Sequence, residues 1–370
     1  MFWYLVICVL MMYPLSIRRA GSVSGKKTQQ LALLLSCLIL WFFMAMRHVS
    51  VGVDTKYYSY VFTQFPDIPF HKIFTAVTYA TPKRNWTFDF EPGYRLLNKL
   101  VSIFSSSPQA ITVVNSTLII ALLYLFVRRE SPNFLLSMWL YLTLGIYQTE
   151  MNVTRNAIAI LMVYNAMPYA RSRQFRRYLV WCLAASTIHM AALMFIPVYW
   201  LFHNVKITPK LAVMLVLGSC VVGVLFPFIS PLITAITPSS LDKYFQGSNE
   251  ELGSLVVGMF NGALFFMACM MMQRRERRRL FSENSIGVTM LVLNLCFFGL
   301  NIGLADASRM AALFGPYLIV FLPQALKMIE SRSRKLDATA AVATVSGVVY
   351  ILRMFVNNIG GTMPYLFFWQ

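Results

Sequence analysis

Long apolar runs alternate with short polar breaks along almost the whole chain. A helix needs about 20 predominantly apolar residues to cross a hydrocarbon core of roughly 30 Å. The pattern therefore predicts an all-α, polytopic integral membrane protein with about 10–12 transmembrane helices. The first run lacks a preceding basic segment and a cleavage site, so we expect a retained span rather than a signal peptide. The expected spans are residues 2–16, 31–46, 109–127, 132–149, 152–170, 211–228, 253–272, 286–303, 309–327 and 338–356.

The run at residues 178–202 departs from this alternation. Ser186, Thr187 and His189 interrupt it, and the basic loops on both sides place its two ends on the same face of the membrane. About twelve residues of helix reach only about 18 Å, which is too short to cross. We therefore predict a broken or re-entrant helix pair with His189 near its tip. The alternative is an ordinary span here and a hairpin at residues 211–237 instead.

The longest polar stretch, residues 47–108, is expected to form an external loop in a single membrane domain that covers residues 1–370. Pro92 suits a first helical turn, and apolar residues follow it at helical spacing. This predicts an amphipathic helix on the outer leaflet, with its polar groups toward the lipid headgroups. Asp89 and Glu91 are expected to cap this helix rather than bind a metal, because no histidine accompanies them.

Composition and charge exclude several classes of protein. The chain is 58% hydrophobic and 12% charged, whereas a soluble chain carries roughly a quarter charged residues. Its net charge of +18 would by itself suggest a nucleic-acid partner. However, 21 of the 32 basic residues fall in alternate loops with only five acids, which is the distribution that marks cytoplasmic loops. The charge thus indicates topology and no nucleic-acid partner, with both termini and the long loop outside.

Several polar residues lie near the predicted outer ends of spans. Arg47 ends the second span and precedes a glycine-containing turn with Asp54; it either extends to the interface or helps to shape a binding loop. Gln148, Asn152 and Arg155 are spaced four and three apart, which would place them on one helix face.

Amide side chains on such a face often join helices, whereas an arginine inside a span needs an anionic partner and indicates a functional site. His189 is either a packing residue or a catalyst beside a water-filled cavity. Asp306 and Arg309, three apart, can pair with each other.

These residues together resemble a known family. The pieces that carry the resemblance are Arg47, Val51-Gly52-Val53-Asp54-Thr55, Tyr58, Glu91-x-Gly93-Tyr94-x-x-x-Asn98, Met151-Asn152-x-x-Arg155-x-x-Ile158-Ala159, His189, Ser308-Arg309-Met310-Ala311 and Pro364-Tyr365. In this order they resemble the EpsG family of Wzy-like polysaccharide polymerases. Two positions differ from the pattern that the resemblance leads us to expect: Arg47-His48-Val49-Ser50 before the turn, and Asn156 where Gln is usual.

The resemblance implies a bacterial inner-membrane glycosyltransferase of GT-C-like architecture, inverting and independent of metals and cofactors. Its substrate would be an oligosaccharide repeat unit linked through diphosphate to undecaprenol, used on the periplasmic face. A chain-length-determining co-polymerase would be a partner besides the lipid bilayer. The product would be an O-antigen, capsule or exopolysaccharide. The residues implied in substrate binding are Arg47, Tyr58, Tyr94, Asn98, Gln148, Asn152, Arg155, Arg309 and Tyr365.

The residue types suit this chemistry. Arginine binds phosphate oxygens through fixed, bidentate donors, which stabilises negative charge on a departing diphosphate. The attacking hydroxyl needs a general base within hydrogen-bond reach, for which His189, Asp54 and Glu91 are the candidates. An O-antigen ligase would use the same chemistry. A flippase for the same lipid is a further alternative, but no internal repeat supports it.

Overall fold

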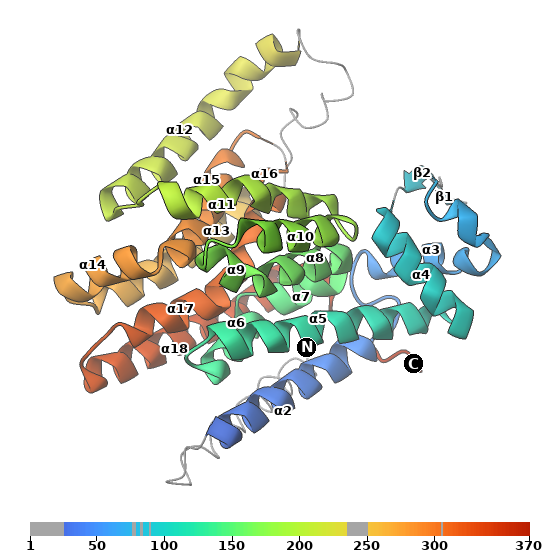
Figure 1. Cartoon of the computed structure of the whole chain (residues 1–370), viewed down its shortest axis with the longest axis horizontal. Helices are drawn as coiled ribbons and strands as arrows, with labels where there is room; N and C mark the ends of the chain where they lie inside the picture. Colours follow the sequence, from blue (N-terminus) through green and yellow to red (C-terminus); the bar gives the residue numbers. More distant parts are fainter. Residues whose placement is uncertain (1–25, 76–78, 82–83, 89, 235–250, 305) are drawn as a thin grey trace. The chain divides into compact units, whose positions relative to one another are not determined.

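The computed structural model describes residues 26–75, 79–81, 84–88, 90–234, 251–304 and 306–370 (Figure 1). Within these residues, five helices are long and apolar enough to cross a membrane, and a sixth candidate consists of two helices bent by 90°. The protein is therefore an all-α polytopic membrane protein, as its sequence predicts. The predicted span at residues 2–16 lies outside the described part of the chain. The five are Lys27–Ala45, Pro108–Glu130, Pro209–Ser230, Ala307–Lys327 and Arg332–Asn357.

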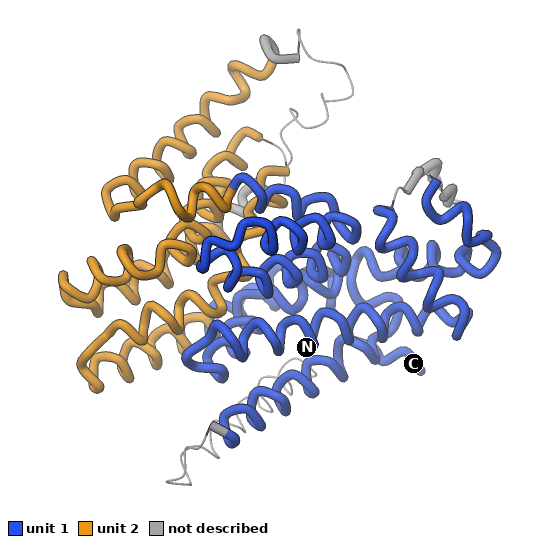
Figure 2. The backbone as a smooth tube through the Cα atoms, viewed as in Figure 1, with its two compact units in different colours: residues 1–197, 347–370 blue, residues 198–346 orange. Residues whose placement is uncertain are grey.

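The contacts divide the chain into two compact units, shown in Figure 2. The first comprises residues 1–197 and 347–370. In it, α5 packs against both α2 and α8. Its elements are α2 (Lys26–Ala45), α3 (Thr55–Phe62), η1 (Phe65–Asp67), η2 (Phe70–Lys72), β1 (Tyr79–Thr81), β2 (Arg84–Phe88), α4 (Pro92–Phe104), α5 (Pro108–Glu130), α6 (Phe134–Thr143), α7 (Ile146–Asn152), α8 (Thr154–Asn165), α9 (Met167–Arg171), α10 (Phe175–Ser186), η3 (Met190–Met194) and η6 (Ile359–Gly361).

The second unit comprises residues 198–346. Helix α15 is its centre and packs against α12, α13 and α16. Glycines let these helices approach closely: a Cβ atom on Gly299 would lie 2.4 Å from Ser219 Oγ. Its elements are α11 (Phe195–Asn204), α12 (Pro209–Thr234), α13 (Glu251–Met270), α14 (Arg274–Glu283), α15 (Ser285–Leu300), α16 (Ala307–Phe314), η5 (Gly315–Tyr317), α17 (Leu318–Lys327) and α18 (Arg332–Asn357), of which α11 and α18 continue into the first unit.

The chain turns at His189, as predicted. Helix α10 ends at Ser186, and His189 has an extended backbone before η3. The hydroxyl of Tyr178 donates to the carbonyl oxygen of Phe195 at 3.0 Å, so the chain folds back on itself after the turn. The alternative hairpin at residues 211–237 is wrong, because α12 is a continuous helix from Pro209 to Thr234.

The segment around Arg155 is more broken than its sequence suggests. Helix α6 ends before Gly145, whose φ of +77° favours glycine, and α7 ends at Asn152. Val153 has non-helical angles and separates α7 from α8. Gln148 and Asn152 lie four residues apart in α7, as predicted, but Arg155 belongs to α8, so the three do not lie on one continuous helix.

The 47–108 segment contains α3, η1, η2, a small β-hairpin and α4. In the hairpin, Tyr79 pairs with Phe88 and Thr81 pairs with Arg84 in antiparallel register, which the sequence analysis did not predict.

Helix α4 is amphipathic with an exposed apolar face, as predicted, but its polar face packs on protein instead of facing the lipid headgroups. Tyr94, Arg95 and Asn98 are buried, while Phe104 on the apolar side is 88% exposed. The apolar face is therefore available to lipid, and the polar face contacts protein.

Candidate active site

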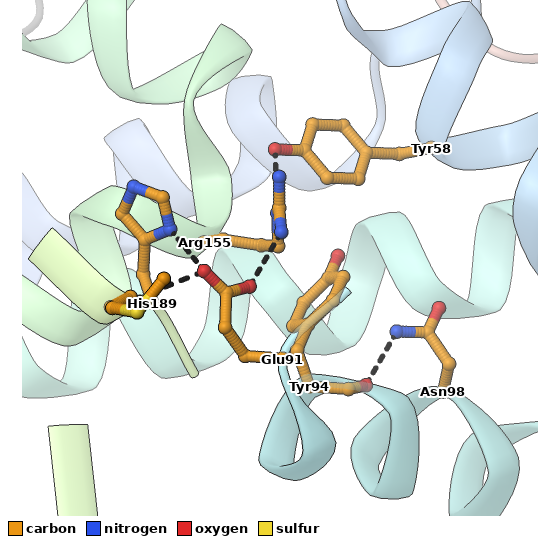
Figure 3. A network of polar contacts seen from close by, with 7 residues as sticks. Tyr58, Glu91, Tyr94, Asn98, Arg155 and His189 are labelled. Carbon is orange, nitrogen blue, oxygen red and sulfur yellow. Dashed lines mark hydrogen bonds and ion pairs between the residues drawn. The ribbon is translucent and has the colours of Figure 1, made fainter. Parts of the chain in front are cut away.

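Glu91 contacts two of the candidate site residues, one through each carboxylate oxygen (Figure 3). Its Oε2 lies 2.6 Å from Nη1 of Arg155 in α8, and its Oε1 lies 2.7 Å from Nδ1 of His189. The backbone N–H of Met190 also donates to Oε1, at 3.0 Å. The three side chains are 16%, 20% and 29% exposed for Glu91, Arg155 and His189, so a ligand can reach them.

The start of α4 positions Glu91 by docking on the turn that precedes His189. The backbone N–H groups of Gly93 and Tyr94 donate to the carbonyl oxygen of Thr187 at 2.7 and 3.2 Å. A Cβ atom on Gly93 would lie 2.8 Å from that oxygen and 2.3 Å from the Thr187 hydroxyl oxygen, so only glycine fits. Although Glu91 occupies the N-cap position, its side chain makes no capping bond, and the expected capping role is wrong. Asp89, the other expected cap, lies outside the described residues.

Aromatic rings surround the guanidinium of Arg155. Its Cζ atom is 4.6 Å from the centre of the Phe90 ring and 5.9 Å from those of Tyr58 and Tyr94, distances at which cation–π attraction operates. Its Nε donates to the Tyr58 hydroxyl across a long 3.4 Å contact. Tyr94 is fully buried, and its hydroxyl accepts a hydrogen bond from Asn115 Nδ2 at 2.8 Å. These rings fix the plane of the guanidinium.

The electrostatics of the site keep Glu91 ionised. Burial would raise the pKa of Glu91, but the His189 hydrogen bond and the Arg155 charge outweigh it and lower the pKa to about 2. Burial also raises the pKa of Tyr57. The charge of Arg155 partly offsets this rise in the pKa, and the charge of Asp54 adds to it. Asp54 is thus electrostatically linked to the same region.

An ionised Glu91 also sets the chemistry of His189. A carboxylate accepts hydrogen bonds and has no proton to donate, so the neutral imidazole carries its proton on Nδ1. The lone pair is then on Nε2. This is the arrangement in which a carboxylate orients a histidine as a proton acceptor.

Other residues expected to bind substrate are engaged in packing. Arg47 is 2% exposed, and its guanidinium donates to the carbonyl oxygens of Met44 and, at 3.0 Å, of Met151. The hydroxyl of Tyr365 donates to the carbonyl oxygen of Phe43 at 2.7 Å. Arg47 and Tyr365 thus join the end of α2 to α7 and to the C-terminal segment.

The amides expected in the site also connect backbone segments. Asn152 Nδ2 donates to the carbonyl oxygen of Gly360 at 2.8 Å, and Asn152 Oδ1 accepts from the Asp54 N–H at 3.3 Å. Gln148 Nε2 donates to the hydroxyl of Tyr350. Asn98 Nδ2 donates to the carbonyl oxygen of Tyr94 at 2.7 Å.

Arg309 lies in the second unit, where it forms the expected pair with Asp306. Its Nε is 3.0 Å from Asp306 Oδ1, and its side chain is 76% exposed.

Sequence analysis missed two contributors to the site, Phe90 and Thr187. Phe90 is adjacent to Glu91 and is 1% exposed, and Thr187 acts through its backbone carbonyl. The glycine at position 93 was the available signal, since a glycine two residues from a candidate carboxylate indicates close backbone approach. Within the described residues, no three His, Cys, Asp or Glu side chains gather as a metal site would require.

Comparison with known proteins identifies one family. The model of the EpsG family matches residues 30–367 of the chain. No curated protein and no solved structure matches this chain. The match extends over both units and includes Glu91, Arg155 and His189.

Proposed function

This chain belongs to the EpsG family, whose members are Wzy-like proteins of the polysaccharide-polymerase type, and from that premise we propose that it is a glycosyltransferase that lengthens a surface polysaccharide. The donor is an oligosaccharide joined through diphosphate to undecaprenol. The growing chain is transferred from its carrier to the sugar of an incoming lipid-linked unit, on the periplasmic face of a bacterial inner membrane. The observation that carries this proposal is the contact of Glu91 with both Arg155 and His189.

His189 is the general base. Its Nε2 accepts the proton of the acceptor hydroxyl as that oxygen forms a bond to the anomeric carbon of the donor. The bond between the anomeric carbon and the diphosphate oxygen breaks in the same step, so the configuration inverts. Glu91 holds the imidazole by Nδ1 and stabilises the imidazolium that forms. Asp54 is the second candidate base, because it is the acid of the Gly52-Val53-Asp54 turn that matches the family pattern.

Arg155 stabilises the departing lipid diphosphate. A guanidinium has five N–H donors, more than its contacts with Glu91 and Tyr58 engage. Because the rings of Phe90 and Tyr94 fix its orientation, the charge is already in place where negative charge develops. Arg309, in the second unit, remains a candidate substrate contact on the family resemblance alone.

Purified protein supplied with a lipid-diphosphate oligosaccharide tests this proposal. We expect a ladder of glycans, each one repeat unit longer than the last, with or without a chelator of divalent cations. A strict requirement for Mg²⁺ or Mn²⁺ would contradict the metal-independent mechanism. Transfer of the lipid-linked sugar across vesicles without lengthening would contradict the proposal and favour a flippase. Transfer of finished glycan to a different acceptor without lengthening would favour a ligase.

A further inference from the structure

The second unit contains an apolar groove that shares no residue with the Glu91 site. It encloses about 520 Å³ between α12, α13 and α15, within the size range of ligand-binding pockets. Its walls include Leu217 and Phe266, which are 60% and 64% exposed. In a membrane, such exposed apolar walls contact acyl chains.

One face of α14 lines the end of this groove with positive charge. Arg274, Arg277, Arg278 and Phe281 all line it. Arg277, Arg278 and Phe281 follow Arg274 by three, four and seven residues, which places all four side chains on a single face of the helix. The axes of α14 and the apolar α15 meet at 90°. Helix α14 therefore lies across the end of α15, as an interfacial helix does.

Among the described side chains, no carboxylate forms an ion pair with these three arginines. Glu276, on another side of α14, is bound by Arg334 at 3.1 Å, and Glu283 pairs with Arg279 at 2.9 Å. The acids of α14 are therefore used elsewhere, and the groove-facing guanidinium groups lack an anion.

The helix is also fixed in place. Gln273 and Glu276 form a capping box at its start, and Glu276 Oε1 accepts from the backbone N–H of Glu330 at 2.8 Å. At its end, Asn284 Nδ2 donates to Gln324 Oε1 at 2.7 Å. The arginines are thus presented by a preorganised element rather than a loose loop.

We propose that this groove binds an anionic phospholipid, with its acyl chains between α12, α13 and α15 and its phosphate on the arginines of α14. A free phosphate would leave the apolar groove unfilled, and a zwitterionic lipid would leave the arginines only partly neutralised. Basic residues beside apolar membrane-facing grooves have this preference for anionic headgroups. Guanidinium groups suit phosphate because they bind it bidentately. The inference does not depend on the proposed glycosyl transfer.

Native mass spectrometry of the delipidated full-length protein, resupplied with phosphatidylglycerol or phosphatidylcholine, tests the headgroup contact. We expect preferential retention of phosphatidylglycerol. The double variant Arg277→Gln/Arg278→Gln should weaken that retention about tenfold. The matched control Arg275→Gln/Arg279→Gln removes the same charge from the same helix, outside the groove, and should retain the lipid as the unaltered protein does.

A second pair of variants tests the acyl-chain contact. A Cβ atom on Gly262 meets only the methyl carbons of Leu295, at 3.5 and 3.7 Å, so Gly262→Leu fills the groove without a backbone clash. Gly218→Leu is the control, because nothing lies within 4 Å of its Cβ position. Only the first should reduce retention of phosphatidylglycerol.

Three results would overturn the inference. Equal retention of both lipids would indicate a groove without headgroup preference. Equal loss in the two double variants would indicate a general basic surface. Displacement of the lipid by millimolar inorganic phosphate would indicate a site for the free anion.

Discussion

Glu91 connects α8, through Arg155, to the turn before η3, through His189. A carboxylate placed between a cation and an imidazole restrains both, and here it determines which imidazole nitrogen can accept a proton. The residue types were predictable from the sequence as candidates. The role of Glu91 was not, because it was expected to be a cap or a base, and the structure gives it two partners instead.

Glu91→Gln tests the orienting role of this carboxylate. The amide keeps the shape of the side chain but has one oxygen and no charge, so it cannot accept from Arg155 and His189 together. We expect the rate of glycan lengthening to fall by about 10²-fold to 10⁴-fold. Glu283→Gln, which alters an exposed ion pair in α14, is the control and should leave the rate unchanged. Full activity of Glu91→Gln would contradict the role.

The lowered pKa of Glu91 predicts how stability depends on pH. Its pKa is about 2 in the folded protein, against an ordinary value of 4.5. The stabilisation is complete above pH 4.5 and is lost as pH falls through about 2, because only the unfolded chain takes up the proton in that interval. The difference in melting temperature between the unaltered protein and Glu91→Gln should therefore shrink as pH falls from 4.5 toward 2. A difference that grows over this interval would contradict the prediction.

At the scale of elements, hydrophobic spacing predicted α4 and the interruption at His189, but not that the polar face of α4 packs on protein. Periodicity shows which residues share a face and leaves open what that face contacts. In a membrane, an apolar face can remain against lipid, so the polar side of α4 is the one that packs on protein. The break at Val153 was missed because neither Gly nor Pro marks it.

Gly93→Ala tests the docking of α4. The added methyl group collides with the carbonyl and side chain of Thr187, which displaces the start of α4 and moves Glu91 from His189. We expect lengthening to fall by at least about tenfold, since misplacement of roughly 1 Å costs on the order of 10²-fold. Gly218→Ala, with open space at its Cβ position, is the matched control. Equal activity of the two variants would show that the docking contact is dispensable.

For the whole molecule, composition and loop charge were enough to predict a polytopic membrane protein, which the five long apolar helices confirm. They could not predict the site. Glu91 is 64 residues from Arg155 and 98 from His189 in the chain, and only tertiary packing brings them together. The family resemblance supplied what local patterns could not: an ordered set of positions that includes all three.

The orientation predicted from loop charge can be tested with single cysteines. Lys72, in the long loop, and Arg275, in α14, are both exposed. Lys72→Cys should react with a membrane-impermeant maleimide in intact spheroplasts, whereas Arg275→Cys should react only after permeabilisation. The protein with neither substitution provides the background. Reaction of both from the same side would contradict the topology, and the reversed result would place the long loop and Glu91 in the cytoplasm.

The central claim is that His189 takes the proton of the attacking hydroxyl, and the most direct measurement is the single-turnover rate of glycan lengthening by purified His189→Ala. The matched control is His203→Ala, which removes a histidine that packs on Tyr199 in the second unit. We predict that His189→Ala remains folded and loses about 10²-fold to 10⁴-fold in rate, and that His203→Ala has an unchanged rate. A rate for His189→Ala within about twofold of the unaltered protein would contradict the account and direct attention to Asp54.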